Sequence, residues 1–291
     1  AFTKQNKGRT STRCPRRSSE KSTKMTSLLR ICNVTRSCSR LLSTSSVNPS
    51  PIVLVHGSYQ GAWVWERVMP LLQAGGRRAV AVELPGSTTK EAMDGASPPT
   101  LSQYFDTVRA AVQREAKKGG FPVTLVGHSL GGAVIQGVGE QTPDRCRLLV
   151  FLAGQLLRDG ESVATRRYQE GYAYVRGAFT PTKDAQWAVP NEAFIKEVFF
   201  NKCTEEDVAE YSKKMIPQAQ VPLVTPIQLS KENYGTLPRV YIECLQDNFI
   251  PIDLQRRFHQ TSPCREVISL DADHAPFLSK TKELAEILLR L

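Results

Sequence analysis

The stretch VTLVGHSLGG, residues 123–132, decides the fold. Its first four residues form an apolar run that predicts a buried β-strand. The run leads directly into the G-x-S-x-G motif of residues 127–131, and a helix of small residues is expected to follow as far as Gln141. A serine on a sharp turn between a strand and a helix is the arrangement called a nucleophile elbow. G-x-S-x-G alone is a weak match, so the flanking strand and helix carry the prediction.

Strand and helix patterns alternate on both sides of this motif, which implies right-handed crossovers and a mainly parallel sheet flanked by helices. The predicted strands are Ile52–Val55, Ala79–Leu84, Val123–Val126, Leu148–Leu152, Arg239–Cys244 and Glu266–Leu270. Helices are predicted over about 63–72, from Thr100 or Ser102 to Lys118, and over about 280–289. The alternation lapses over about 156–225, which is rich in aromatic residues. We expect this segment to form a helical cap over the carboxyl edge of the sheet, within one domain of residues 51–291.

The net charge of +10 is concentrated at the start of the chain. Residues 1–50 contain eleven Lys or Arg and one acid, which gives 11 − 1 = +10, so the 27 basic and 27 acidic residues that follow cancel. A protein that binds nucleic acid needs a basic surface on its folded domain, so we do not expect a nucleic-acid partner. There is no apolar run of eighteen residues, and no membrane insertion is expected.

The first fifty residues resemble a targeting segment. From Met25 onward they contain arginines, many Ser and Thr, and no acid, which is typical of an organellar transit peptide. We predict a disordered leader that directs the protein to mitochondria, with a plastid or cytoplasmic location as alternatives. A basic tail without a targeting role also remains open, and residues 1–24 are interpreted as an upstream extension.

The catalytic residues can be sought by elimination, because the chain has only four histidines. A serine hydroxyl needs a base near neutral pH, and Ser129 is the expected nucleophile. His274 follows the last predicted strand, in the order serine, acid, histidine that this arrangement requires. Asp247 lies in the loop after the preceding strand and is the expected acid. His128 is expected to project away from the site, and His259 is interpreted as structural.

Two backbone N–H groups are expected to stabilise the oxyanion. One is that of Leu130, which follows the nucleophile, and the other is that of Ser58 after the first strand. His56 and Gly57 are expected to support this second loop. The seven cysteines form no CxxC pair or cluster with histidine at zinc spacing, so neither a metal nor a cofactor is expected.

Five separated motifs occur along the chain: VLVHGSYQGAWVWERVMPLL (53–72), GHSLGG (127–132), FFNKCTEEDVAEYSKKMIPQAQVPLVTP (199–226), RVYIECLQDNFIP (239–251) and DADHAPFL (271–278). Together they resemble the plant-type methylesterase and hydroxynitrile lyase branch of the α/β-hydrolases. The resemblance implies a lidded hydrolase without a cofactor that acts on small esters of apolar or aromatic acids. Gly57, His128 and Ala275 stand where the lyases have threonine, glutamate and lysine, and these differences favour an esterase. Glu83 stands where an aspartate is common.

The sequence therefore predicts a serine carboxylic-ester hydrolase. The alternatives are a hydroxynitrile lyase, a thioesterase or lactonase on the same residues, or a ligand-binding receptor that has kept the fold. The expected partner is a small ester, and a homodimer is left open.

Overall fold

Six parallel strands form the central sheet of the computed structural model, which describes residues 50–87, 97–169 and 177–291. The sheet has the order β2-β1-β3-β4-β8-β9, and every neighbouring pair is parallel. The strands are β1 (Ile52–Val55), β2 (Ala79–Val82), β3 (Val123–His128), β4 (Cys146–Leu152), β8 (Arg239–Cys244) and β9 (Glu266–Leu270). All six predicted strands are confirmed, and the parallel sheet with them. The predicted leader lies outside the described residues.

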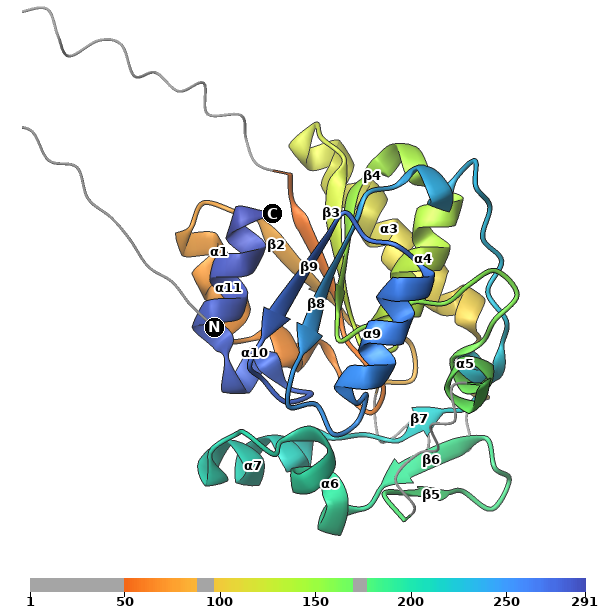
Figure 1. Cartoon of the computed structure of the whole chain (residues 1–291), viewed down its shortest axis with the longest axis vertical. Helices are drawn as coiled ribbons and strands as arrows, with labels where there is room; N and C mark the ends of the chain where they lie inside the picture. The colour runs from red at the N-terminus through yellow and green to blue at the C-terminus, as the bar shows by residue number, and fades with distance from the viewer. Residues whose placement is uncertain (1–49, 88–96, 170–176) are drawn as a thin grey trace, which may run out of the picture. The chain divides into compact units, whose positions relative to one another are not determined.

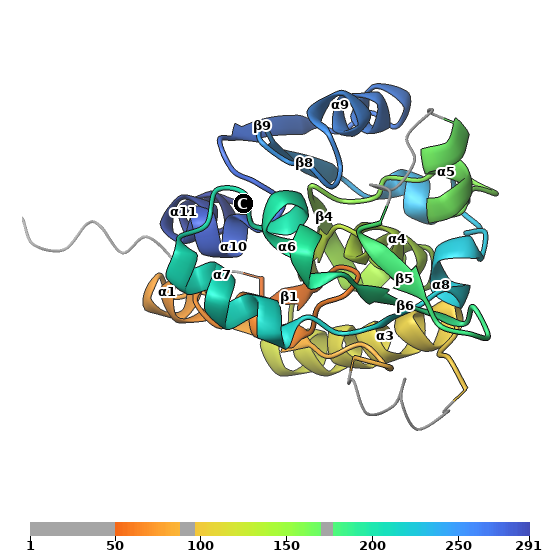
Figure 2. The same ribbon diagram turned by 90° about the horizontal axis from the view of Figure 1, so that it is seen from below.

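Helices cover both faces of the sheet (Figure 1). On one side lie α1 (Val68–Ala74), α10 (Pro276–Ser279) and α11 (Thr281–Arg290), and on the other lie α3 (Leu101–Gly119), α4 (Gly131–Gln141) and α9 (Ile252–Thr261). Figure 2 shows the same division from below. Both faces of β1 and β3 are therefore buried, which explains why these strands are continuous apolar runs.

The helix predicted over residues 63–72 is divided in the structure. A 3₁₀ turn occupies Ala62–Trp65, and α1 begins only at Val68. Pro70 has no N–H, so it is tolerated only in the first turn of a helix, where that donor would be unpaired anyway. Its position forces the α-helix to begin just before it.

The segment between β4 and β8 forms the predicted cap, but helices are only part of it. The cap contains α5 (Val163–Gln169), α6 (Glu192–Phe199), α7 (Glu205–Tyr211) and α8 (Val221–Val224). It also contains a three-stranded antiparallel sheet of β5 (Phe179–Pro181), β6 (Trp187–Pro190) and β7 (Gln218–Ala219), which the sequence did not predict. In Figure 1, α6, α7 and the strands β5, β6 and β7 lie below the ends to which the arrows of β8 and β9 point. The cap therefore faces the carboxyl edge of the parallel sheet, as predicted.

Candidate active site

Ser129 occupies a strained turn between β3 and α4. Its φ of 51° lies in the left-handed region that residues other than glycine seldom adopt. The Ser129 N–H donates to Leu152 O at 3.1 Å, and Ser129 O accepts from the N–H of Gln155 at 2.8 Å. A side chain at Gly127 would place its Cβ 2.4 Å from Gly131 O, so only glycine fits. The structure thus has the geometry of a nucleophile elbow.

His274 and Asp247 form a buried pair. His274 Nδ1 lies 2.7 Å from Asp247 Oδ2, and both side chains are at most 1% exposed. The other carboxylate oxygen accepts the N–H groups of Phe249 and Ile250, each at 2.8 Å. Gln255 Nε2 donates to Oδ2 at 3.3 Å. These donors fix the carboxylate, and the carboxylate in turn orients the His274 ring so that Nε2 is the nitrogen left to take a proton.

Ser129 and His274 are brought into one site through His128. His128 Nε2 donates to His274 O at 2.8 Å, and the two imidazole rings are centred 4.6 Å apart. Within the described part of the chain, no hydrogen bond joins Ser129 Oγ to the His274 ring. In hydrolases without substrate this contact is often long and tightens only when substrate binds.

His128 lies in the site, whereas the sequence analysis expected it to project away. Burial lowers its pKa well below the usual range, and the neighbouring His274 lowers it further. A neutral His128 that donates from Nε2 carries no proton on Nδ1, which lies 3.1 Å from Gln60 Oε1. That oxygen accepts the Gly57 N–H at 3.3 Å. His128 therefore ties the elbow to the loop of His274 by a hydrogen bond and lies against the loop after β1. Its position next to Ser129 was visible in the sequence, but its direction was not.

The loop after β1 lies directly beside the elbow. A Cβ added to Gly57 would lie 2.7 Å from Ser129 Cβ, so the backbone itself is in close approach. The His56 ring accepts the Leu84 N–H at Nε2 over 3.2 Å and contacts Gly57 O through Nδ1 at 2.9 Å. Because a backbone N–H can only donate, Nδ1 carries the proton of this histidine. His56 thereby holds the loop against the end of β2.

The backbone N–H groups of Ser58 and Leu130 have no acceptor among the residues that the structure describes. Leu130 immediately precedes α4, so its N–H belongs to the donors that a helix leaves unpaired at its start. An oxyanion hole needs such unpaired backbone N–H groups, and Ser58 and Leu130 are the two residues that the sequence analysis expected to supply them.

Aromatic side chains surround His274. The rings of Phe249 and Phe199 are centred 4.8 and 5.7 Å from the imidazole. Phe179 of β5 packs on both phenylalanines and stacks on Tyr59 at 4.3 Å. Residues from the cap and from the core thus build one apolar environment around the site.

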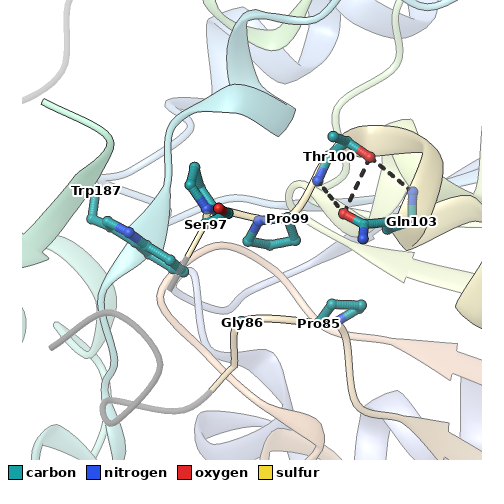
Figure 3. Close-up of a pocket in the computed structure, with 8 residues that line it drawn as sticks. Pro85, Gly86, Ser97, Pro99, Thr100, Gln103 and Trp187 are labelled. Carbon is teal, nitrogen blue, oxygen red and sulfur yellow. Dashed lines mark hydrogen bonds between the residues drawn. The ribbon is translucent and has the colours of Figure 1, made fainter. Parts of the chain in front are cut away.

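A cavity of about 380 Å³ opens between the cap and the end of β2 (Figure 3). Two of its lining residues, Pro85 and Gly86, lie in the chain between Leu84 and Ser87. Because Leu84 N and Ser87 Oγ both contact His56 Nε2, the cavity lies close to His56. The Trp187 indole forms one wall and lies so close to Gly86 that an added Cβ would be 3.1 Å from it. Its lining residues are Pro85, Gly86, Ser97, Pro98, Pro99, Thr100, Gln103 and Trp187.

The remaining histidine is structural, as expected. His259 Nε2 lies 3.2 Å from Glu243, whose carboxylate also accepts from Arg256 and Ser269. Among the residues described, no group of three or more His, Cys, Asp or Glu side chains is arranged to hold a metal ion. In the same residues no helix is long and apolar enough to cross a membrane.

The chain belongs to the α/β hydrolase family, whose model matches residues 52–287. This confirms the fold that the elbow motif and the alternation of strands and helices predicted, and the methylesterase relatives below confirm the resemblance. Among its relatives is the Arabidopsis thaliana protein named "Putative methylesterase 11, chloroplastic", which is 33% identical over 82% of this chain and 63% of its own length. Methylesterase 3 of the same plant is 28% identical over 82% of this chain and 95% of its own length.

A solved structure of another hydrolase has a similar fold. A pyrethroid hydrolase from Sphingobium faniae JZ-2 is 27% identical and superposes with a TM-score of 0.72, covering 83% of this chain and 96% of its own. The chain spans only 55–63% of the length of the first three relatives that it matches in sequence.

Proposed function

We propose that this protein is a serine carboxylic-ester hydrolase of the methylesterase type. The observation that carries the proposal is the buried His274–Asp247 pair, 2.7 Å long, in the same site as a serine on a strained elbow. The names of its methylesterase relatives support the same reaction.

In the proposed reaction, Ser129 Oγ attacks the ester carbonyl carbon and passes its proton to His274 Nε2. Asp247 stabilises the imidazolium that forms. The carbonyl oxygen becomes an oxyanion, which the N–H groups of Ser58 and Leu130 stabilise. The C–O bond then breaks, and the alcohol leaves with the proton from His274. Water repeats the sequence on the acyl-enzyme and releases the acid.

Two residues favour ester hydrolysis over cyanohydrin cleavage. A leaving cyanide needs a positive charge beside the protonated base, and Ala275, which follows the base, cannot supply it. No lysine lies between Arg239 and Ser279 to replace it. Gly57 approaches Ser129 so closely that a threonine would not fit without moving the elbow.

The substrate is proposed to be a small ester with an apolar or aromatic part. The phenylalanines around His274 favour an apolar acyl group. If the substrate contains an aromatic ring, we assign that ring to the cavity beside Trp187. The walls of this cavity, an indole and prolines, suit a flat ring.

We propose a plastid location, which was the alternative to mitochondria in the sequence analysis. Five of the relatives carry "chloroplastic" in their names, and these names favour the plastid over the mitochondrion. A fusion of residues 25–50 to a fluorescent protein should label plastids in leaf cells. Labelling of mitochondria, or diffuse fluorescence, would contradict this location.

The function is tested by a substrate screen with the wild type and Ser129→Ala. We expect hydrolysis of methyl and p-nitrophenyl esters, no cleavage of mandelonitrile above background, and a loss of roughly 10⁴-fold in the variant. Cleavage of mandelonitrile faster than of any ester would favour the lyase. Tight binding of an ester with turnover slower than its release would favour the receptor.

A further inference from the structure

Asp273 immediately precedes the proposed base and is fully buried. Its carboxylate accepts four hydrogen bonds, and in the described part of the chain it forms no ion pair with Lys or Arg. A buried carboxylate without a cation is costly unless its oxygens are hydrogen-bonded. Each of the four donors is therefore important for keeping this charge in place.

The four donors come from two different parts of the fold. Oδ1 accepts from the Ala275 N–H at 3.1 Å and from Ser279 Oγ at 2.7 Å, both on the base side. Oδ2 accepts from the Lys202 N–H at 2.8 Å and from Cys203 Sγ at 3.5 Å, which lie in the cap between α6 and α7. The Asp273 side chain thus joins the cap to Ala275 and Ser279, which follow His274 in the chain.

We propose that Asp273 is a positioning residue that couples the cap to the catalytic base. The inference rests on the proposed function, because it takes His274 as that base. The Lys202 N–H and Cys203 Sγ of the cap donate to Oδ2 and so fix the orientation of the Asp273 carboxylate. In this orientation Oδ1 accepts the Ala275 N–H, which fixes the backbone next to His274. His128 Nε2 donates to the His274 carbonyl at 2.8 Å and fixes the same loop at a second point. With its backbone fixed in this way, His274 places Nδ1 within hydrogen-bond distance of Asp247. If the cap is displaced, Asp273 turns, the loop shifts, and the imidazole of the base is misplaced.

The direct test is Asp273→Asn, with Asp271→Asn as the matched control. Asparagine has nearly the same shape but turns one acceptor oxygen into an NH₂ donor, so it cannot serve both the cap and the base loop. We expect kcat for p-nitrophenyl acetate to fall by about 100-fold, as for a misplacement of about 1 Å, with KM within about twofold, because ester contacts are kept. Asp271 is exposed and, among the described residues, accepts only from the Gln246 side chain at 3.1 Å, so its variant should retain wild-type kcat.

Coupling is tested apart from catalysis by amide hydrogen exchange in Ser279→Ala and Cys203→Ala. Each variant removes one donor, on the base side or the cap side, and is mild enough to fold. If Asp273 couples the two sides, Ser279→Ala should speed exchange of the Lys202 amide, and Cys203→Ala that of the Ala275 amide.

Faster exchange only on the side of the substitution would overturn the proposal. So would an unchanged kcat in Asp273→Asn. If the wild type hydrolyses no ester, the proposed function fails, but the exchange experiment still decides whether Asp273 couples the cap to the loop.

Discussion

A single methyl group at Gly57 should disable the site. The added Cβ would lie 2.7 Å from Ser129 Cβ and 2.9 Å from His128 Nδ1, whereas non-bonded carbon atoms favour about 3.5–4.0 Å. Relief therefore needs a movement of about 1 Å. Neither neighbour moves freely, because Ser129 is on the strained elbow and His128 is bonded to the His274 carbonyl.

Gly57→Ala should accordingly lower kcat/KM for p-nitrophenyl acetate by about 100-fold, the effect of a misplacement of about 1 Å. Overpacking should lower the free energy of unfolding by about 1–3 kcal/mol. Gly119→Ala is the matched control, since its Cβ would meet nothing closer than Pro51 Cγ at 3.4 Å. Wild-type kcat/KM in Gly57→Ala would refute the close approach of this loop to the nucleophile.

Three further predictions concern pH, stability and substrate size. Because burial holds the folded pKa of His128 well below about 6.5, its unfolded value, only the unfolded state gains this proton as the pH falls below that value. Between pH 7 and pH 5, urea denaturation should show that the wild type loses about 2 kcal/mol more stability than His128→Gln, and equal losses would show that His128 is charged when folded. Burial would raise the pKa of Glu140, but hydrogen bonds from Ser230, Tyr234 and Asn233 lower it below 4.5. The ionised carboxylate therefore stabilises the folded protein fully above pH 4.5, and this contribution is lost as the pH falls through the folded pKa. Glu140→Gln should cost about 2 kcal/mol at pH 7 and nothing near pH 2, which thermal melts at both pH values would check. Trp187→Leu should raise KM for methyl phenylacetate about tenfold, roughly 1.4 kcal/mol of lost ring contact, and leave KM for methyl acetate unchanged; an equal change for both esters would remove the cavity from the substrate site.

The parallel sheet could be predicted because its central strands, β1, β3, β4 and β8, are almost entirely buried. Ile52–Val55 and Arg239–Cys244 have the bounds that their apolar patterns predicted. The sheet in the cap could not, because its strands are two to four residues long and β6 pairs with the distant β7. Such short strands leave no periodicity in the sequence.

The candidate site divides in the same way. Ser129, His274 and Asp247 follow strands, and chain order is enough to predict that their loops meet at one edge of the sheet. Gln255 and Asp273 act through hydrogen bonds across loops, and no spacing reveals those partners. Their importance follows only from burial and contact geometry.

Covalent labelling tests most directly whether Ser129 is the nucleophile. The wild type, Ser129→Ala and His274→Ala should be incubated with a fluorophosphonate, and intact and peptide masses measured. We expect one adduct per chain, on Ser129, and no adduct in Ser129→Ala. Labelling should be slowed by at least about 100-fold in His274→Ala, the lower end of the contribution of a general base. An adduct on another residue, or ester hydrolysis that survives in Ser129→Ala, would contradict the assignment of Ser129 as the nucleophile.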